Sequence, residues 1–367
     1  FKHKKPSGVW IMAYTTIDKP SDYFNTKLYT GTGSSLAITG VGFQPDWIWF
    51  KERGATRSHA LVDSVRGRSK VVFADLANAE ETSAASTNDL KSFDSDGFTV
   101  GVTNVSGSFN TSSGTHVAWN WKAGTTISST STSGSGTAKT YTGSVSTASG
   151  FSIIRYVGNG TAGHTIPHHL GAKPDVILVK HLGDGQQWAT QWSPLGATKV
   201  MRFATTNAVS DSNTRWNDTE PTTSVFTLGN EAEGNTNDGN HIAYCFTNIQ
   251  GYSKVGSYTG NGNADGPFVY TGFKPAFVLG KRTDSAGGWW LSDNKRSSGF
   301  NLNDEYLVAD SSNAEQNDGS FASDFLSNGW KARATNGNFN ADGGEYIYMA
   351  FAENPFVTSG GVPATAR

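Results

Sequence analysis

The sequence contains a single cysteine, Cys245, among its 367 residues. One cysteine cannot form a disulfide within the chain, so no internal disulfide scaffold can hold the fold together. Cys245 lies in the apolar stretch 241–246, where a cysteine serves as a small buried hydrophobic side chain. We therefore expect packing and hydrogen bonds to stabilise the fold.

Charge is scarce as well. Charged residues make up only 16% of the chain and leave a net charge of −2. Such a chain has no positive field to collect nucleic acid or an anionic membrane, and its short basic start at 2–5 is interpreted as a solvated tail. No apolar run approaches the roughly 18 residues of a membrane helix. We predict no nucleic-acid partner and no membrane insertion.

Catalytic signatures are missing too. The sequence has no Gly-X-Ser-X-Gly elbow, no His-Glu-X-X-His helix and no phosphate-binding Gly-X-X-X-X-Gly-Lys loop. Its acidic residues lie mostly in polar turns, although two carboxylates meeting across a groove would suit a polysaccharide depolymerase. We predict no enzyme, no catalytic residue and no cofactor, with depolymerase activity kept as an alternative.

Glycine and aromatic residues are plentiful, at 43 glycines and 12% aromatics. This balance is typical of turn-rich antiparallel sheets with polar outer faces. Short β-branched or aromatic runs are broken by Gly, Asn or Asp along most of the chain, which also indicates strands. The fold class that follows is all-β.

One pattern occurs three times. A Tyr-X-Gly-X-Gly turn stands at 29–33, 156–160 and 258–262. Each turn is followed by a proline-led apolar run, and each segment closes on a second apolar run. The proline-led runs are 45–51, 174–180 and 275–281, and the closing runs are 116–121, 241–246 and 346–351. A repeated pattern of this kind predicts copies of one structural unit of roughly a hundred residues.

The predicted architecture is three tandem homologous β-sandwich repeats of two-sheet or jelly-roll type, preceded by an extended N-terminal arm. The stretch 125–150 is rich in Ser, Thr and Gly, and two interpretations of it are open: a flexible linker or polar edge strands. The predicted boundaries are 1–26 for the arm, 27–124, 151–252 and 253–357 for the repeats, and 358–367 for a C-terminal tail.

Three stretches carry a resemblance to a known family. They are AYTTIDKPSDYF at 13–24, YTGNGNADGPFVYTGFKPAFVLGKRTD at 258–284 and YIYMAFAENPFVTSGGVPATAR at 346–367. The chain from Met12, which we consider as a natural start, resembles a largely uncharacterised virion protein family of tailed bacteriophages, common in phages of marine bacteria. The resemblance implies a virion component with concanavalin-like units, and it brings no catalytic residues.

Tryptophan is the residue type that most suggests a ligand site, because an exposed indole face can stack on a sugar ring. Tryptophans within the apolar runs, such as Trp47 and Trp119, are predicted to pack in the core. Others stand in or beside polar, glycine-rich segments. These candidate ligand-binding residues are Trp188, Trp192, Trp216, Trp289 and Trp290.

Two further motifs allow two interpretations each. Asn261, Asn263 and Asp265 match the first half of a calcium loop, but the twelfth position is glycine, and tight-turn chemistry explains the same residues. Asp63 with Arg66, and Asp293 with Arg296, can pin a loop as ion pairs or bind an anion, and the pin is favoured.

These observations lead to one main functional hypothesis. We expect a non-enzymatic tail-fibre or adhesin-type protein on the virion that binds host-surface glycan through loop aromatics. A head-decorating or purely structural virion protein is the alternative. The expected partners are other virion subunits and host glycan, and the expected assembly is a homo-oligomer, with a trimer as the first hypothesis.

Overall fold

The computed structural model describes residues 2–4, 10–83, 88–103, 105, 108–297 and 300–365. Over these residues the fold is all-β, as predicted, with several antiparallel sheets. Helical structure in the described part is confined to single turns, none of which is long and apolar enough to span a membrane. These turns are η1 (Pro20–Asp22), α1 (Asn213–Trp216), α2 (Ala232–Asn235) and α3 (Gly337–Asn340).

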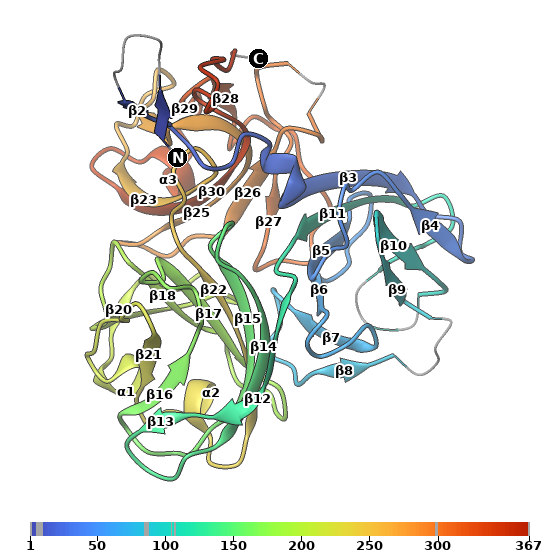
Figure 1. Cartoon of the computed structure of the whole chain (residues 1–367). Helices are drawn as coiled ribbons and strands as arrows, with labels where there is room; N and C mark the ends of the chain where they lie inside the picture. Colours follow the sequence, from blue (N-terminus) through green and yellow to red (C-terminus); the bar gives the residue numbers. More distant parts are fainter. Residues whose placement is uncertain are drawn as a thin grey trace.

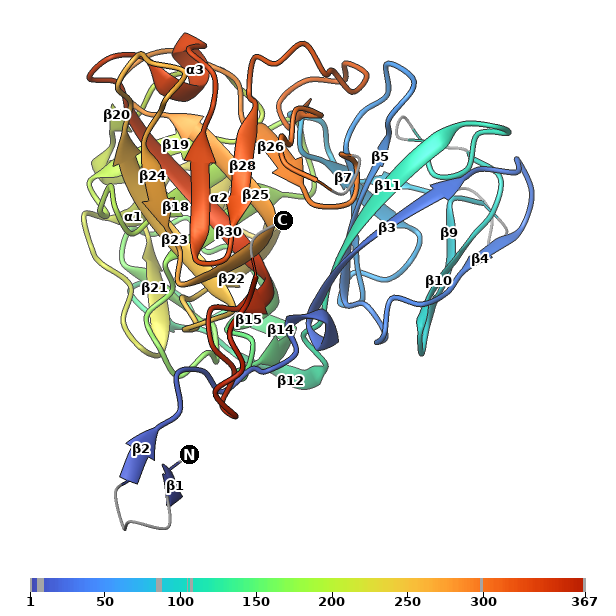
Figure 2. The same ribbon diagram turned by 90° about the horizontal axis from the view of Figure 1, so that it is seen from above.

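At the N-terminus, β1 (Lys2–Lys4) and β2 (Trp10–Met12) pair with each other. Figure 2 shows this pair standing away from the main body. The chain then runs through η1 into three successive units, each of which contains one large antiparallel sheet and one three-stranded sheet.

The first unit spans residues 24–121. Its large sheet has the order β3-β11-β5-β6-β7-β8 and its small sheet the order β4-β10-β9. The strands are β3 (Phe24–Thr30), β4 (Leu36–Ile38), β5 (Trp47–Glu52), β6 (Ala60–Asp63), β7 (Lys70–Phe73), β8 (Glu81–Thr82), β9 (Leu90–Asp94), β10 (Gly97–Val100) and β11 (Thr115–Trp121).

The second unit spans residues 125–246. Its sheets have the orders β12-β14-β15-β22-β17-β18-β19-β20 and β13-β16-β21. The strands are β12 (Thr125–Ser131), β13 (Ser133–Gly134), β14 (Thr140–Ser146), β15 (Phe151–Val157), β16 (His164–Pro167), β17 (Val176–His181), β18 (Ala189–Trp192), β19 (Lys199–Arg202), β20 (Ser210–Asp211), β21 (Val225–Leu228) and β22 (Asn240–Phe246).

The third unit spans residues 253–355, with the orders β23-β30-β25-β26-β27 and β24-β29-β28. The strands are β23 (Ser253–Thr259), β24 (Phe268–Tyr270), β25 (Phe273–Arg282), β26 (Trp290–Asp293), β27 (Leu307–Val308), β28 (Ser323–Leu326), β29 (Gly329–Ala332) and β30 (Glu345–Pro355). In the large sheets of all three units the closing strand lies between the strand that leads into the Tyr-X-Gly-X-Gly turn and the proline-led strand.

The second unit differs at one edge of its large sheet. There β14 pairs with β15, and β12 pairs with β14, so two further strands extend the sheet. They come from the stretch rich in Ser, Thr and Gly, which is therefore strand rather than free linker over most of its length. Over the residues that the structure describes, the corresponding strands β3 and β23 end their sheets.

The Tyr-X-Gly-X-Gly turns have a common physical basis. A Cβ on Gly31 would lie 2.2 Å from the Thr111 carbonyl oxygen, so only glycine allows this close approach. Gly33 has a φ of +70°, in the left-handed region that glycine adopts without strain. The buried Asn110 side chain accepts a hydrogen bond from the turn at Thr32 N–H, at 2.7 Å. Asn235 and Asn340 play the same part in the other turns.

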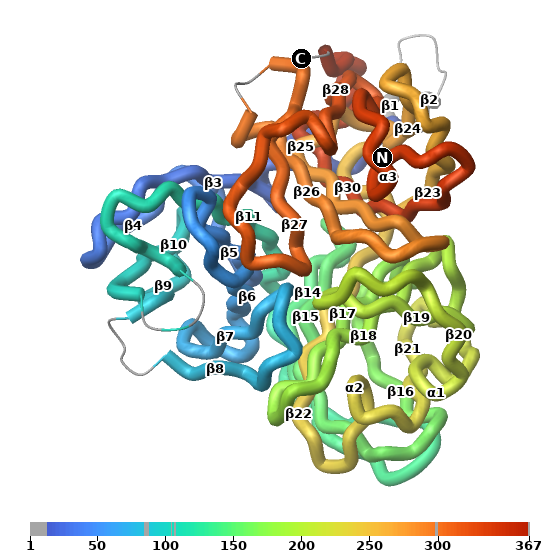
Figure 3. The backbone as a smooth tube through the Cα atoms, turned by 180° about the vertical axis from the view of Figure 1, so that it is seen from behind, coloured from blue at the N-terminus to red at the C-terminus, as the bar shows by residue number. Residues whose placement is uncertain are grey.

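The three units close into a ring (Figures 1 and 3). Each unit has its own apolar core between its two sheets. The opposite faces of the three large sheets meet in a central core that holds side chains from every unit, such as Trp47, Tyr244 and Phe351. The central strands of each large sheet, such as β5, β17 and β25, are therefore buried on both faces, which explains why they are largely apolar runs.

Candidate functional site: the junctions between the units

All five tryptophans predicted to bind ligand are buried. Their exposed fractions are 0% for Trp188 and Trp289 and 1% for Trp192, Trp216 and Trp290. A ring without an exposed face cannot stack on a sugar, so these side chains do not form the expected surface site. The sequence context misled the prediction because polar loops flank the positions where the units meet.

The structure assigns three of these tryptophans to junctions. Trp188 of the second unit donates from Nε1 to the Phe73 carbonyl of the first unit, at 2.8 Å. Trp289 of the third unit donates to the Arg202 carbonyl of the second unit, at 3.2 Å. Trp192 lies in the central core, with its ring centroid 5.4 Å from that of Trp289. The remaining two, Trp216 and Trp290, pack in the cores of the second and third units.

One buried lysine connects each pair of units. Lys51 donates to the Ser312 carbonyl of the third unit at 3.3 Å, and Lys180 donates to the Ala77 carbonyl of the first at 3.0 Å. Lys281 completes the cycle with the Thr206 carbonyl of the second unit, at 2.9 Å. Burial lowers the pKa of each of these ammonium groups to about 8.

A backbone hydrogen bond accompanies each lysine, always at the residue two positions after it. The carbonyl of Arg53 accepts from Glu315 N–H at 2.8 Å, and that of Leu182 accepts from Glu80 N–H at 3.0 Å. At the remaining junction, the Thr283 carbonyl accepts from Val209 N–H at 2.9 Å. The three junctions thus share the same two kinds of contact, which run in a cycle from unit to unit.

The Asp-X-X-Arg pairs also lie at junctions. Arg66 Nε is 2.5 Å from Asp63 Oδ2, both side chains are buried, and Tyr244 of the second unit donates its hydroxyl to the same carboxylate oxygen at 2.7 Å. This carboxylate is fully used by protein partners. The predicted pin is thus the arrangement observed, rather than an anion site.

The second pair repeats this geometry with a different partner. Arg296 Nε is 2.6 Å from Asp293 Oδ2, which accepts from Trp119 Nε1 of the first unit at 2.9 Å. The guanidinium carbon also lies 5.5 Å from the centroid of the Trp119 ring. Burial alone would raise the pKa of Asp293, but Arg296 outweighs it and holds that pKa below its ordinary value.

The second unit has no such pair. By strand register, Trp192 occupies the position of Asp63 and Asp293. Met349 of the third unit likewise stands where Tyr244 and Trp119 stand in the other two units. The carboxylate and its hydrogen-bond donor are therefore both absent from this junction, and two apolar side chains take their places in the central core.

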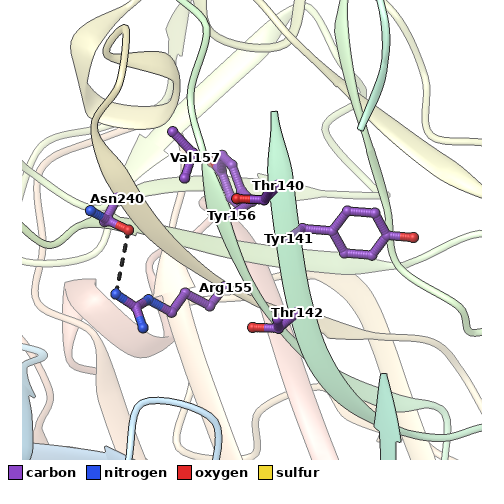
Figure 4. A pocket seen from close by; sticks show the side chains of 7 residues that line it. All are labelled: Thr140, Tyr141, Thr142, Arg155, Tyr156, Val157 and Asn240. Carbon is purple, nitrogen blue, oxygen red and sulfur yellow. Dashed lines mark hydrogen bonds between the residues drawn. The ribbon is translucent and has the colours of Figure 1, made fainter. Parts of the chain in front are cut away.

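Three surface hollows are candidate ligand sites. One of about 370 Å³ lies between the second and third units and contains a single carboxylate, that of Glu345. One of about 220 Å³ on the second unit is lined by Thr142, Arg155 and Asn240, with Arg155 donating to Asn240 Oδ1 at 3.4 Å (Figure 4). One of about 70 Å³ contains only Glu353. None of the three brings together the two carboxylates that a glycosidase needs.

The calcium candidates form a turn. Asn263 N–H donates to Asn261 Oδ1 at 3.0 Å, and Asp265 N–H donates to Asn263 Oδ1 at 2.9 Å. The Asp265 carboxylate pairs with Lys331. These side chains point to their own backbone, as Asn and Asp commonly do in tight turns. Among the described residues no group of three or more His, Cys, Asp or Glu side chains is placed to hold a metal ion.

Exposed aromatic side chains do occur on the third unit. Phe268 is 46% exposed and Tyr270 is 54% exposed, on alternate positions of β24. By register, Thr165 and Pro167 occupy the corresponding positions in the second unit. The aromatic pair is thus specific to one unit, and the sequence analysis did not single it out because an alternating strand pattern does not show which face is covered.

The fold and its junctions define a class of protein, namely an all-β chain whose sandwich-like units close around a shared core. The chain belongs to the family described as "Domain of unknown function (DUF7483)", whose model matches residues 19–355. Comparison with curated proteins and with solved structures finds no match. The family description names no activity.

Proposed function

We propose that the chain is a non-enzymatic structural component of a bacteriophage virion, made of three tandem homologous β-sandwich repeats closed into a rigid ring. The observation that carries a structural role is the burial of Trp188, Trp192 and Trp289 in the central core. Side chains that a glycan-binding protein would expose are used to close the ring. The virion location and the virion subunits as partners rest on the family resemblance.

Common origin of the three units has its own support. Lysines 51, 180 and 281 stand at the same place in each unit and make the same cyclic contacts. An aromatic or imidazole ring from the closing strand stacks on each turn tyrosine at nearly the same distance, 4.9 Å in the first unit and 5.0 and 4.7 Å in the others. Convergence on so many shared details is less economical than duplication.

Immunogold electron microscopy of the phage that encodes the chain tests the location. Label over the head or the tail tube of intact particles supports a structural part. Label confined to fibre tips favours an adhesin, and particles without label contradict the virion assignment. Antibody raised against the folded ring is the probe, with particles lacking the gene as the control.

An adhesin that binds host glycan is the second candidate, and the exposed pair on β24 favours it. Phe268 and Tyr270 point from the same face of one strand, as a stacking platform requires. Replacement of both by alanine should abolish binding of the purified chain to host cells. The matched control is Thr165→Ala at the corresponding position of the second unit. Binding that survives loss of both aromatic side chains contradicts this candidate.

A further inference from the structure

The hollow of about 220 Å³ on the second unit lies where β14, β15 and β22 run side by side, with Thr142 of β14 opposite Arg155 of β15. Side chains alternate between the two faces of a strand. Tyr141 and Tyr156 therefore belong to the core on the other face, and Figure 4 shows the Tyr141 ring pointing away from the side of Arg155. The side chains that share the face of the hollow are Thr140, Thr142, Arg155, Val157 and Asn240.

Arg155 is an exposed arginine whose charge is not neutralised within the chain. It forms no ion pair with any described carboxylate, and its guanidinium donates one long hydrogen bond, to Asn240 Oδ1 at 3.4 Å. A guanidinium has five N–H donors. Other arginines do pair with a carboxylate, namely Arg53, Arg66, Arg202, Arg215, Arg282, Arg296 and Arg333. The Arg155 guanidinium therefore keeps most of its donors for a group from outside the chain.

The carboxylate next to the hollow in sequence does not compete for this guanidinium. Asp238 stands two residues before Asn240 and pairs with Lys139 at 2.5 Å. Its other carboxylate oxygen accepts from Asn237 Nδ2 at 3.0 Å. Both oxygens of Asp238 are thus in use, and the hollow keeps the positive charge of its arginine.

The equivalent places in the other units lack this charge. Counted back from the first glycine of each turn, Leu28 and Ser257 stand at the position of the arginine. By strand register, Thr115 in the first unit and Glu345 in the third stand at the position of the asparagine. Over the described residues, β14 has no counterpart beside β3 or β23. The basic hollow is therefore particular to the second unit and is not required by the repeated architecture.

The chemistry of the lining indicates the kind of ligand. A guanidinium binds a carboxylate through two parallel hydrogen bonds. Thr140, Thr142 and Asn240 add hydroxyl and amide groups, which both donate to and accept from the hydroxyls of a sugar. A hollow of about 220 Å³ is smaller than the roughly 300–1,000 Å³ of sites for drug-sized ligands, so it suits one small polar unit. A uronic acid residue, which is a sugar ring with a carboxylate, has all of these properties.

A protein partner matches the hollow less well. Protein interfaces are centred on aromatic and other large side chains that become buried on binding. The face of the hollow contributes one apolar side chain, Val157, which is already half-buried. A carboxylate from a protein would bind the guanidinium, but it would leave the surrounding hydroxyl and amide groups without matching partners.

We propose that this hollow binds a uronic acid residue of an acidic polysaccharide. The Arg155 guanidinium holds the carboxylate, and Thr142 on one side and Asn240 on the other form hydrogen bonds with ring hydroxyls. The inference stands on the second unit alone and does not depend on the virion assignment. It differs from the adhesin candidate in place and in ligand, because the aromatic pair on β24 offers rings and no charge.

Uncharged analogues of the ligand test the role of the carboxylate. The probes are the methyl glycosides of glucuronate, galacturonate and mannuronate, and their methyl esters are the matched controls. At least one acid should bind the full chain in the millimolar range, and its ester should bind about tenfold more weakly or less well still. Ligand-detected NMR titration measures both. A chain that binds none of the acids, or that binds acid and ester equally, overturns the proposal.

Substitutions then test the assigned residues. Arg155→Gln removes the positive charge and should weaken binding of the acid by about tenfold or more. Asn240→Asp should have a similar effect, because the new carboxylate pairs with the guanidinium in place of the ligand. Thr142→Val removes one hydroxyl and should weaken binding by about threefold to tenfold. Arg57→Gln, at an exposed arginine of the first unit, is the control and should bind like the original chain.

Thermal melting shows whether each variant is folded, and the exposure of Arg155 and Asn240 predicts melting temperatures close to that of the original chain. Unchanged binding of the acid by folded Arg155→Gln overturns the proposal. A peptide rich in aspartate serves as the competing probe. If it binds more tightly than every uronate, the hollow recognises a protein carboxylate and the assignment to a polysaccharide is wrong.

Discussion

The junction between the first and second units is held by a buried ion pair, whereas the equivalent place between the second and third is apolar. At the first, Asp63 and Arg66 pair and receive the hydroxyl of Tyr244. At the second, Trp192 and Met349 stand in the corresponding positions. The ring closes in both cases, so the ion pair is not what closes it.

The contacts common to all junctions are the lysine on a carbonyl of the neighbouring unit and the backbone bond two residues further on. These contacts fix how neighbouring units are placed. At the position that varies (Asp63, Trp192 or Asp293), the side chain matches the polarity of the side chain that faces it from the next unit. A buried carboxylate needs a donor, and a tryptophan ring needs apolar surroundings. A junction has either the carboxylate with its donor or the two apolar side chains. A carboxylate facing an apolar side chain would be a buried polar group without a partner.

Breaking the ion pair gives the largest expected effect. Asp63→Asn removes the nearer and more deeply buried of the two carboxylates that pair with Arg66 and leaves only Glu80, at 3.1 Å, so the expected cost is about 3 kcal/mol in the free energy of unfolding. Urea denaturation followed by tryptophan fluorescence measures it. Loss of both charges in Asp63→Leu/Arg66→Met should cost less than the single change, since the carboxylate left behind, that of Glu80, is partly exposed and keeps Lys70 at 3.5 Å. A single change that costs under about 1 kcal/mol contradicts the assigned role.

The neighbouring side chain gives a smaller effect that differs between junctions. Tyr244→Phe removes a hydroxyl that donates to Asp63 and accepts from Arg66, and should cost about 1.5–3 kcal/mol. Met349→Leu at the apolar junction conserves volume and should cost less than about 1.5 kcal/mol. Equal losses in the two variants, measured by the same denaturation experiment, would mean that the junctions do not differ in the way described.

Local features of the fold were predictable from the sequence. The all-β class follows from short apolar runs between turn residues, and the structure confirms it. The Tyr-X-Gly-X-Gly turns were also predictable. Gly31 is required there because a Cβ would clash, and Gly33 because its φ is positive. Such constraints act over a few residues and leave a direct trace in the sequence.

The junctions were not predictable in this way. Trp289 meets the carbonyl of Arg202, and Lys51 meets that of Ser312, across separations of 87 and 261 residues. The partner atoms are backbone carbonyls, which leave no mark on residue type. A polar loop around Trp289 therefore looks the same whether the ring faces solvent or another unit, and this ambiguity is why the ligand-binding prediction failed.

The shared lysines give the smallest effect, a change in the pH dependence of stability. Their pKa is about 8 in the folded chain against an ordinary 10.5, so the stability linked to them is present above pH 10.5 and lost as pH falls through 8. The free energy of unfolding should therefore rise between pH 8 and 9. Burial raises the pKa of Cys245 to about 12. Above pH 9 this cysteine therefore lowers the free energy of unfolding as pH rises, which opposes the effect of the lysines.

One variant at each junction tests whether the three lysines are equivalent. Lys51→Met, Lys180→Met and Lys281→Met should each remove about a third of that rise, because each takes away one of three alike titrating groups. Denaturation curves at closely spaced pH values measure the slope, and Lys295→Met, an exposed position, is the control. If one variant removes the whole rise in the free energy of unfolding, the lysine at that junction alone has the lowered pKa. The three junctions are then not equivalent, although their hydrogen bonds are the same.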